Sequence, residues 1–397
     1  MLQAVLANPN HPQYGVATIP FPVKNSDYES TIDLLEPLEI GDAVKQDCRI
    51  EEIRSELSAL KRLERSNANL DEIDYLAKRL DSFDEYEKAQ FQGMASRLDL
   101  HGIDEFINLS FCCQEATVAT DFRGLESLGR RHYLTMNGGS AAVEEMKNKD
   151  FREIALALLE GAVGRVTPYG VVYDNDFEMA QLYDGRNFPQ YRYEDCLMEL
   201  EMASRYAPVD SSAVVYLYLP VSQTQLERAM LRAGIDNYGD LCLRFLESEL
   251  PEEVDAALNF ENESLSDLNE MCRAIKQLSP ADHEMLGAVV ALAKPEQANQ
   301  ITNLAKELEM FEYIPKVRTP EEYGKYIILE SGHFEYDENL VGYIDFARYG
   351  AERIEHEQGE FVDRGYVAYH GTMQLETLMA DAPVGGVGLQ MDNITLF

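Results

Sequence analysis

SLSDLNEMCRAIKQLSPADHEMLGAVVAL, residues 264–292, has apolar residues three and four positions apart, which is the spacing of amphipathic helices. Upstream of it, AVVYLYLPV at 213–221 is an apolar and aromatic run that predicts a strand. Further helices are predicted between the two stretches, over 225–233 and 238–249. Strands followed by a series of short helices are typical of an α+β fold.

The first half of the chain repeats this order. Prolines mark turns in the first 23 residues and predict a small opening sheet, and helical spacing follows at Ile73, Leu76 and Leu80. When the chain is shifted by 195 residues, 66–154 align with 261–349 without a gap, and ten of the 89 aligned pairs are identical. Because the apolar pattern also coincides, we interpret the chain as a diverged internal duplication.

The stretch between the two halves has a different predicted secondary structure. GRVTPYGVVYDNDFEMAQLYDGRNFP, residues 164–189, predicts strand, turn, strand and loop. We therefore expect an N-terminal half over 1–137 that extends to about 154, a middle helix plus β-rich module over 138–210, a C-terminal half over 211–372 and a flexible tail over 373–397.

The charge of the chain is strongly unbalanced, with 71 Asp and Glu against 34 Lys and Arg, a formal net charge of −37. Since 45% of the residues are hydrophobic, the chain is expected to fold rather than to form a disordered acidic tail. Like charge on a compact body repels itself, so the excess predicts an electropositive partner, a saline habitat or a need for solubility. Proteins that hold nucleic acid are one class of electropositive partner.

Three acidic stretches are candidate partner-binding surfaces, because carboxylates three and four residues apart on a helix are spaced much like neighbouring phosphates. Taken one at a time, each is better explained as a solvated helix face or loop, and only the three together favour mimicry. Their acids are Glu247, Glu249, Glu252, Glu253, Asp255, Glu261 and Glu263 in the first, Glu335, Asp337 and Glu338 in the second, and Asp174, Asp176 and Glu178 in the third.

A further stretch, GYIDFARYG at 342–350, carries a family resemblance together with the acidic helices before it and a terminal strand pattern at 359–371. Its residues Tyr343, Asp345, Phe346, Tyr349 and Gly350 match a Tyr-x-Asp-aromatic-x-x-aromatic-Gly pattern. From about Val214 to Gly371 the chain resembles the ArdA antirestriction proteins. The first half keeps Asp150 and Phe151 of this pattern but lacks its tyrosines and glycine.

The resemblance implies an elongated chain of small subdomains, with two diverged ArdA-like halves joined by the β-rich middle module. It also implies a DNA mimic that occupies the DNA-binding groove of type I restriction-modification enzymes, binds no nucleic acid itself and has no cofactor. Tyr343, Phe346 and Tyr349 are spaced by three, so we expect one helical face that serves packing or a homodimer contact, with Asp345 as a structural acid.

Other readings of the sequence are weaker. The seven histidines lack the spacing of a metal site, and Gly324-Lys325 lacks the first glycine of a phosphate-binding loop. The sequence also contains no motif of a catalytic nucleophile. We therefore expect no catalytic residue, metal or cofactor. No leader or 18-residue apolar run is found, which predicts a cytoplasmic protein without a membrane partner. The alternative function is an acidic adaptor or inhibitor of another basic nucleic-acid-binding protein or nuclease.

Overall fold

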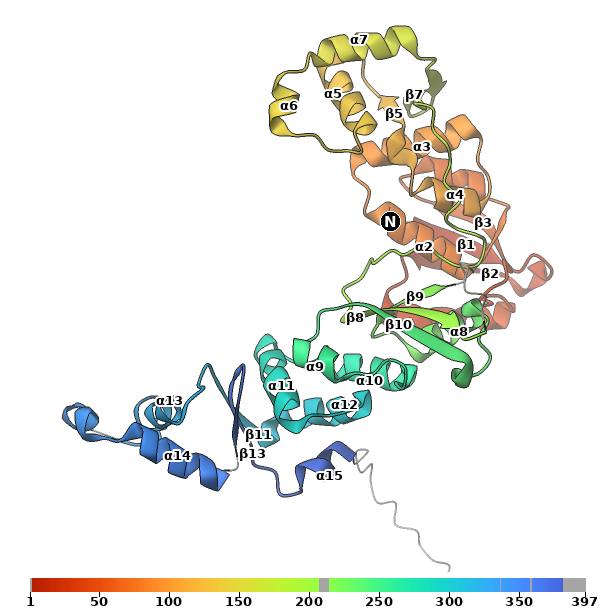
Figure 1. The fold of residues 1–397 in the computed structure, drawn as a ribbon. Helices are drawn as coiled ribbons and strands as arrows, with labels where there is room; N and C mark the ends of the chain where they lie inside the picture. The colour runs from red at the N-terminus through yellow and green to blue at the C-terminus, as the bar shows by residue number, and fades with distance from the viewer. Residues whose placement is uncertain (1, 207–213, 336, 358, 381–397) are drawn as a thin grey trace, which may run out of the picture. The chain divides into compact units, whose positions relative to one another are not determined.

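The computed structural model describes residues 2–206, 214–335, 337–357 and 359–380 (Figure 1). Its contacts divide the chain into two compact units that alternate along the sequence. The first unit comprises Met1–Asp195, Met202–Tyr216 and Ser222–Cys242, and the second comprises Cys196–Glu201, Leu217–Val221 and Leu243–Phe397. Helices and several small antiparallel sheets make up both, which confirms the predicted α+β class.

The helices and strands of the first half occupy residues 2–173, which we call the N-terminal segment. Two of its sheets have the strand orders β2-β1-β3-β4 and β5-β7-β6. Its elements are β1 (Leu2–Ala7), β2 (Val16–Phe21), α1 (Tyr28–Leu35), β3 (Cys48–Arg54), β4 (Asn67–Ala68), α2 (Leu70–Asp81), α3 (Glu85–Leu98), α4 (Ile103–Leu109), β5 (Thr117–Ala119), α5 (Leu125–Met136), α6 (Val143–Lys147), α7 (Phe151–Gly161), β6 (Arg165–Thr167) and β7 (Gly170–Tyr173).

The elements of the second half begin at residue 198, and we call residues 198–369 the C-terminal segment. Its sheets have the orders β10-β8-β9 and β11-β13-β12. The elements are β8 (Met198–Ser204), β9 (Val215–Leu219), α8 (Gln223–Ala233), β10 (Leu241–Ser248), α9 (Glu252–Ala257), α10 (Leu265–Ile275), α11 (Pro280–Ala293), α12 (Ala298–Lys306), β11 (Phe311–Pro315), α13 (Pro320–Lys325), α14 (Phe346–Glu357), β12 (Glu360–Val362) and β13 (Gly365–Tyr369), and α15 (Leu375–Ala380) follows them.

Local sequence signals explain where the central helices begin. Asn69 and Asp84 accept hydrogen bonds from main-chain N–H groups in the first turns of α2 and α3. Ser264 and Ser279 do the same for α10 and α11. These side chains satisfy donors that a helix leaves unpaired at its start. As the helical spacing predicts, Ile73, Leu76 and Leu80 on α2 are buried.

The two segments agree in element positions at the 195-residue shift found in the sequence. Helices α2, α3 and α7 begin at Leu70, Glu85 and Phe151, and α10, α11 and α14 begin 195 residues later. Strand pairing follows the same shift, because β7 pairs with β5 and β6 in the register in which β13 pairs with β11 and β12. The correspondence runs through residue 173, beyond the aligned stretch that ended at 154.

Tertiary contacts also recur at this shift. The Asp74 carboxylate accepts a hydrogen bond from Val23 N at 2.6 Å, and the Asn269 amide oxygen accepts one from Val221 N at 2.9 Å. The acceptor positions 74 and 269 are 195 residues apart, and the donors Val23 and Val221 are 198 residues apart. Helix α5 packs against α7, and α13 packs against α14 (Figure 1). Equivalent side chains therefore hold equivalent elements in the two segments.

Three sequence expectations differ from the observed elements. The helix predicted over 238–249 is wrong, since Leu241–Ser248 form strand β10, whose sheet neighbour β8 provides main-chain partners that a local pattern cannot reveal. Strands β6 and β7, expected in a separate middle module, pair with β5. Within the expected tail, Leu375–Ala380 form α15 with Leu378 buried, while 381–397 lie outside the described residues.

Candidate partner-binding surface

The acidic segment, residues 247–263, joins the end of β10 to the start of α10 through the short helix α9. Pro251 precedes the first residue of α9, where its missing N–H costs no hydrogen bond. The carboxylate residues divide into an exposed group and a group held in the fold. The exposed residues are Glu247, Glu249, Glu252 and Glu261.

Glu253 belongs to the group that is held in the fold. Its carboxylate receives two parallel hydrogen bonds from Arg364, Nε to Oε1 at 2.7 Å and Nη2 to Oε2 at 2.8 Å. These bonds hold the pKa of Glu253 below its ordinary value. A Cβ at Gly287 would stand 2.5 Å from Arg364 Nε, so the glycine leaves room for the ion pair. The charge of Glu253 is thus already compensated within the fold.

Asp255 and Glu263 also have hydrogen bonds within the fold. The Asp255 carboxylate accepts from the Ser248 hydroxyl at 2.8 Å, and Glu263 Oε2 accepts from the main-chain N–H of Ala298, the first residue of α12, at 3.1 Å. Burial raises the pKa of both carboxyl groups. Of the seven candidate acids in this segment, Glu253, Asp255 and Glu263 therefore support the fold through these contacts, and the other four are exposed residues.

The two smaller acidic stretches divide in the same way. Glu335, Asp337 and Glu338 are exposed, and Asp337 also accepts from Asn339 N at the start of a 3-10 helix over Glu338–Tyr343. Asp176 and Glu178 are exposed in the loop after β7. Asp174 instead forms an ion pair with Arg97 of α3, so its charge is compensated.

The residues of the 342–350 motif lie at the start of α14. Asp345 Oδ1 accepts a hydrogen bond from Arg348 N at 3.1 Å, in the first turn of this helix. Phe346 is buried, and Tyr349 packs at the edge of a core cluster that contains Tyr323 and Tyr366. The single helical face expected for the three aromatic residues is wrong, because Tyr343 lies before the helix and is 89% exposed.

Close backbone contact explains the glycine of this motif. A Cβ on Gly350 would stand 1.8 Å from the main-chain oxygen of Pro320, and a Cβ on Gly324 would stand 2.1 Å from that of Phe346. Helices α13 and α14 thus approach each other through these two glycines. The same contact occurs between α5 and α7, because a Cβ on Gly129 would stand 1.7 Å from the main-chain oxygen of Phe151. Gly350 is therefore a packing residue.

Two polar networks were not anticipated from the sequence. In the first, Arg228 and Arg232 of α8 donate to Asp71 Oδ2 at 2.9 and 2.8 Å, and Tyr28 donates to the same carboxylate. Burial acts to raise the pKa of Asp71, but the two guanidinium groups outweigh burial and lower it. The sequence feature that could have indicated this network is the pair Arg228 and Arg232, because two arginines four residues apart lie on the same face of a helix.

The second network lies in the core next to Tyr349. The hydroxyl groups of Tyr323 and Tyr366 both donate to Glu357 Oε2, and Arg353 Nη2 lies 2.6 Å from the other carboxylate oxygen. Burial is the main cause that raises the pKa of both tyrosines, and Glu357 adds to it. At the 195-residue shift the N-terminal segment has Leu128, Val171, Ala162 and Leu158, so this network is present only in the C-terminal segment.

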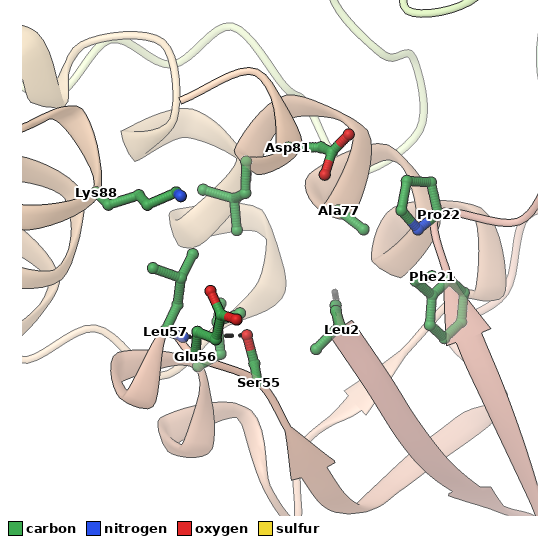
Figure 2. A pocket seen from close by; sticks show the side chains of 11 residues that line it. Leu2, Phe21, Pro22, Ser55, Glu56, Leu57, Ala77, Asp81 and Lys88 are labelled. Carbon is green, nitrogen blue, oxygen red and sulfur yellow. Dashed lines mark hydrogen bonds between the residues drawn. The ribbon is translucent and has the colours of Figure 1, made fainter. Parts of the chain in front are cut away.

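A pocket in the N-terminal segment is lined by residues of β1, β2, α2 and α3 (Figure 2). Glu56, Asp81 and Lys88 supply its charged groups, and Lys88 Nζ lies 2.8 Å from Glu85. Apolar side chains, including Leu2, Phe21 and Leu80, line the rest. These groups do not converge on one point as catalytic or ligand-binding groups do.

Within residues 2–206, 214–335, 337–357 and 359–380, no group of three or more His, Cys, Asp or Glu could hold a metal ion. No helix among those residues is long and apolar enough to cross a bilayer. All six cysteines are free thiols, and Cys242 alone among them is exposed.

The described residues form an α+β protein with a strongly acidic sequence. Residues 215–368 match the family model described as antirestriction protein (ArdA). The match runs from the first residue of β9 to the penultimate residue of β13 and confirms the resemblance seen in the sequence. Residues 215–368 of the chain are thus similar to the ArdA antirestriction proteins. A comparison with curated proteins found no match.

Proposed function

We propose that this chain is an antirestriction protein that acts as a DNA mimic, occupying the DNA-binding groove of a type I restriction-modification enzyme. The observation that supports the proposal most directly is the set of exposed carboxylates at Glu247, Glu249, Glu252 and Glu261 inside the matched region. A groove that binds DNA largely through phosphate charge also attracts carboxylates at similar spacing. Glu335, Asp337, Glu338, Asp176 and Glu178 extend the surface, whereas Asp174, Glu253, Asp255 and Glu263 support the fold.

We further propose that the two segments are diverged copies of one ArdA-like unit. The shared element positions, the shared strand registers and the paired contacts of Asp74 and Asn269 support this proposal. The correspondence favours copies over residues 2–173 and 198–369, with a connecting stretch between them. It follows that β6 and β7 belong to the first copy. An elongated arrangement of the copies and a homodimer are parts of the same proposal, and small-angle scattering would measure the first.

The experiment that tests the mimic is a competition assay. Purified type I enzyme, a labelled recognition duplex and this protein are mixed over a series of salt concentrations, and displacement of the duplex is measured. We expect displacement near one protein per DNA-binding site that weakens steeply with salt, because charge contacts dominate. No displacement at low salt would contradict the proposal and would favour an inhibitor of another basic nucleic-acid-binding protein or nuclease.

A matched pair of variants distinguishes binding through a specific acidic surface from binding through the net charge of the whole chain. E247Q/E249Q/E252Q/E261Q removes four exposed acids from the acidic segment, and E126Q/E144Q/E153Q/E160Q removes four exposed acids from the N-terminal segment. Both variants change the net charge equally. We expect the first to weaken displacement at least tenfold and the second to change it less than threefold. Equal loss in both would mean that the bulk charge alone drives binding.

A further inference from the structure

A helix of the C-terminal segment belongs to the compact unit of the N-terminal segment. Helix α8 lies within residues 215–368, which match the family model. The stretch that contains it, Ser222–Cys242, nevertheless shares the first compact unit with Met1–Asp195. Neither the acidic surface nor the repeated order of elements explains why a helix of one segment belongs to the unit of the other.

The contacts of α8 are made by two buried arginines. The side chains of Arg228 and Arg232 are 10% and 5% exposed, and both pair with Asp71 of α2. Arg228 Nη2 also donates to the main-chain oxygen of Asp42 at 3.1 Å, and Arg232 Nη2 donates to that of Ala43 at 2.7 Å. Several acceptors of the N-terminal segment therefore compensate two guanidinium charges that burial would otherwise make costly.

The stretch that leads from the N-terminal segment to α8 is also bound to α2. We call residues 182–194 the strap. Three tyrosine hydroxyl groups of the strap donate hydrogen bonds to α2, and the pairs are Tyr183 with Glu72 at 2.8 Å, Tyr191 with the main-chain oxygen of Lys78 at 3.2 Å, and Tyr193 with Asp81 at 2.8 Å. Phe188 of the strap stacks on Tyr75 of α2, with ring centroids 4.6 Å apart. The strap therefore contacts α2 at intervals along its length.

The strap and α8 also contact each other. Arg186 of the strap donates to the main-chain oxygens of Leu231 and Arg232 at 2.9 and 2.5 Å. These oxygens lie in the last turn of α8, where carbonyl groups have no partner within the helix. The Arg232 guanidinium lies 4.4 Å from the ring centre of Phe188. The strap, α8 and α2 thus form one connected set of contacts, which we call the junction.

The C-terminal segment does not repeat the residues of the junction. At the 195-residue shift, the α2 and α4 side of the junction changes from Asp71, Tyr75, Arg79 and Phe111 to Ser266, Glu270, Ala274 and Lys306. Helix α1 lies between β2 and β3 as α8 lies between β9 and β10, and its sequence contains no Lys or Arg. The acceptors are thus found in one segment and the arginine donors in the other. This pattern is expected of a contact specific to the pair and not of a feature repeated in both.

We propose that α2 of the N-terminal segment is a docking surface for α8 and the strap, so that the first helix of the second ArdA-like copy is a structural part of the first copy. If α8 leaves this surface, two guanidinium groups and Asp71 lose their compensation, and the strap loses the contacts of Arg186. The two elements therefore dock and undock together. This inference goes beyond the proposed function and is independent of the target enzyme, because it concerns the free chain.

Limited digestion with trypsin tests the junction in the intact chain, because a protease cuts where the main chain opens locally. The strap contains two tryptic sites, Arg186 and Arg192, and the exposed Arg123 of the N-terminal segment is the reference site. We expect wild-type cleavage in the strap to be at least tenfold slower than cleavage after Arg123. R228Q/R232Q changes no residue of the strap, yet it should accelerate strap cleavage at least tenfold and leave the rate at Arg123 unchanged.

R79K tests the same coupling from the side of the strap. Arg79 lies between the rings of Phe111 and Tyr191, 4.3 and 4.4 Å from their centres. Lysine keeps the charge but lacks the flat group that stacks on both rings. We expect R79K to accelerate cleavage after Arg228 and Arg232, in α8, at least threefold.

R273Q/K306Q is the matched control, because it also removes two positive charges, at exposed positions that pair with Glu270. It should change none of these rates by more than twofold. Wild-type strap cleavage as fast as cleavage after Arg123 would overturn the proposal, and so would strap cleavage in R228Q/R232Q no faster than in the control. If R228Q/R232Q unfolds throughout, R79K decides, since unchanged cleavage in α8 would then overturn the proposal.

Discussion

Gly324 lies directly against the main-chain oxygen of Phe346, so close that a Cβ on the glycine would stand 2.1 Å from that oxygen. We therefore expect G324A to separate α13 from α14 and to lower the free energy of unfolding by about 1–3 kcal/mol, the usual cost of overpacking. Urea denaturation with a constant slope measures the loss. G342A is the control, because nothing lies within 4 Å of a Cβ at Gly342. Equal stability of the two variants would contradict the prediction.

Asp71 is the shared acceptor for two buried guanidinium groups, and its removal should be costly. D71N leaves Arg228 and Arg232 with uncompensated buried charge, so we expect a loss of about 3–5 kcal/mol in the free energy of unfolding. D33N, which alters an exposed acid on α1, should change stability by less than about 0.5 kcal/mol. A loss below 1 kcal/mol for D71N in urea denaturation would show that the network contributes little.

Local signals in the sequence predicted the central helices well. In α2 and α10 the apolar spacing and the Asn69 and Ser264 caps lie within a few residues of the helix they specify. Strand β10 was predicted as a helix because its state depends on β8, some 40 residues away in the chain. The 195-residue shift is present in the apolar pattern of the sequence, and the strand registers follow the same shift.

Composition could not predict which acidic residues are exposed and which have contacts within the fold. Glu247 and Glu253 look equivalent in the sequence, yet Glu253 pairs with Arg364, 111 residues later. Asp71 and Arg232 are 161 residues apart. Such contacts depend on tertiary structure, which a charge count does not contain. The sequence therefore located the acidic segment but did not distinguish exposed carboxylates from those held in the fold.

The Tyr323 hydroxyl supplies one donor to the Glu357 carboxylate in the core of the C-terminal segment. We expect Y323F to lower the free energy of unfolding by about 1–3 kcal/mol, because a buried charged acceptor loses a hydrogen bond. Thermal denaturation followed by calorimetry measures the effect. Y343F is the matched control, since the Tyr343 side chain is 89% exposed and should tolerate the change. An unchanged melting temperature for Y323F would indicate that water replaces the hydroxyl group.

The pair of Glu253 and Arg364 makes a prediction about pH. Because Arg364 lowers the pKa of Glu253 in the folded state, the stabilisation is fully present above the unfolded-state pKa of about 4.3 and is lost as the pH falls through the folded-state pKa. We expect E253Q to be less stable than the wild type by roughly 1–2 kcal/mol at pH 7. The difference should shrink as the pH falls below about 4, because the wild-type carboxylate is then protonated as well.

Urea denaturation of the wild type and E253Q at several pH values between about 3 and 7 measures this difference. E252Q is the control, since Glu252 is the neighbouring residue, is exposed, and begins the same short helix α9. Its stability should stay within about 0.5 kcal/mol of the wild type over the whole range. A difference between E253Q and wild type that stays constant from pH 7 to pH 3 would contradict the assignment, because it would mean that Glu253 stabilises the fold through packing and not through its charge.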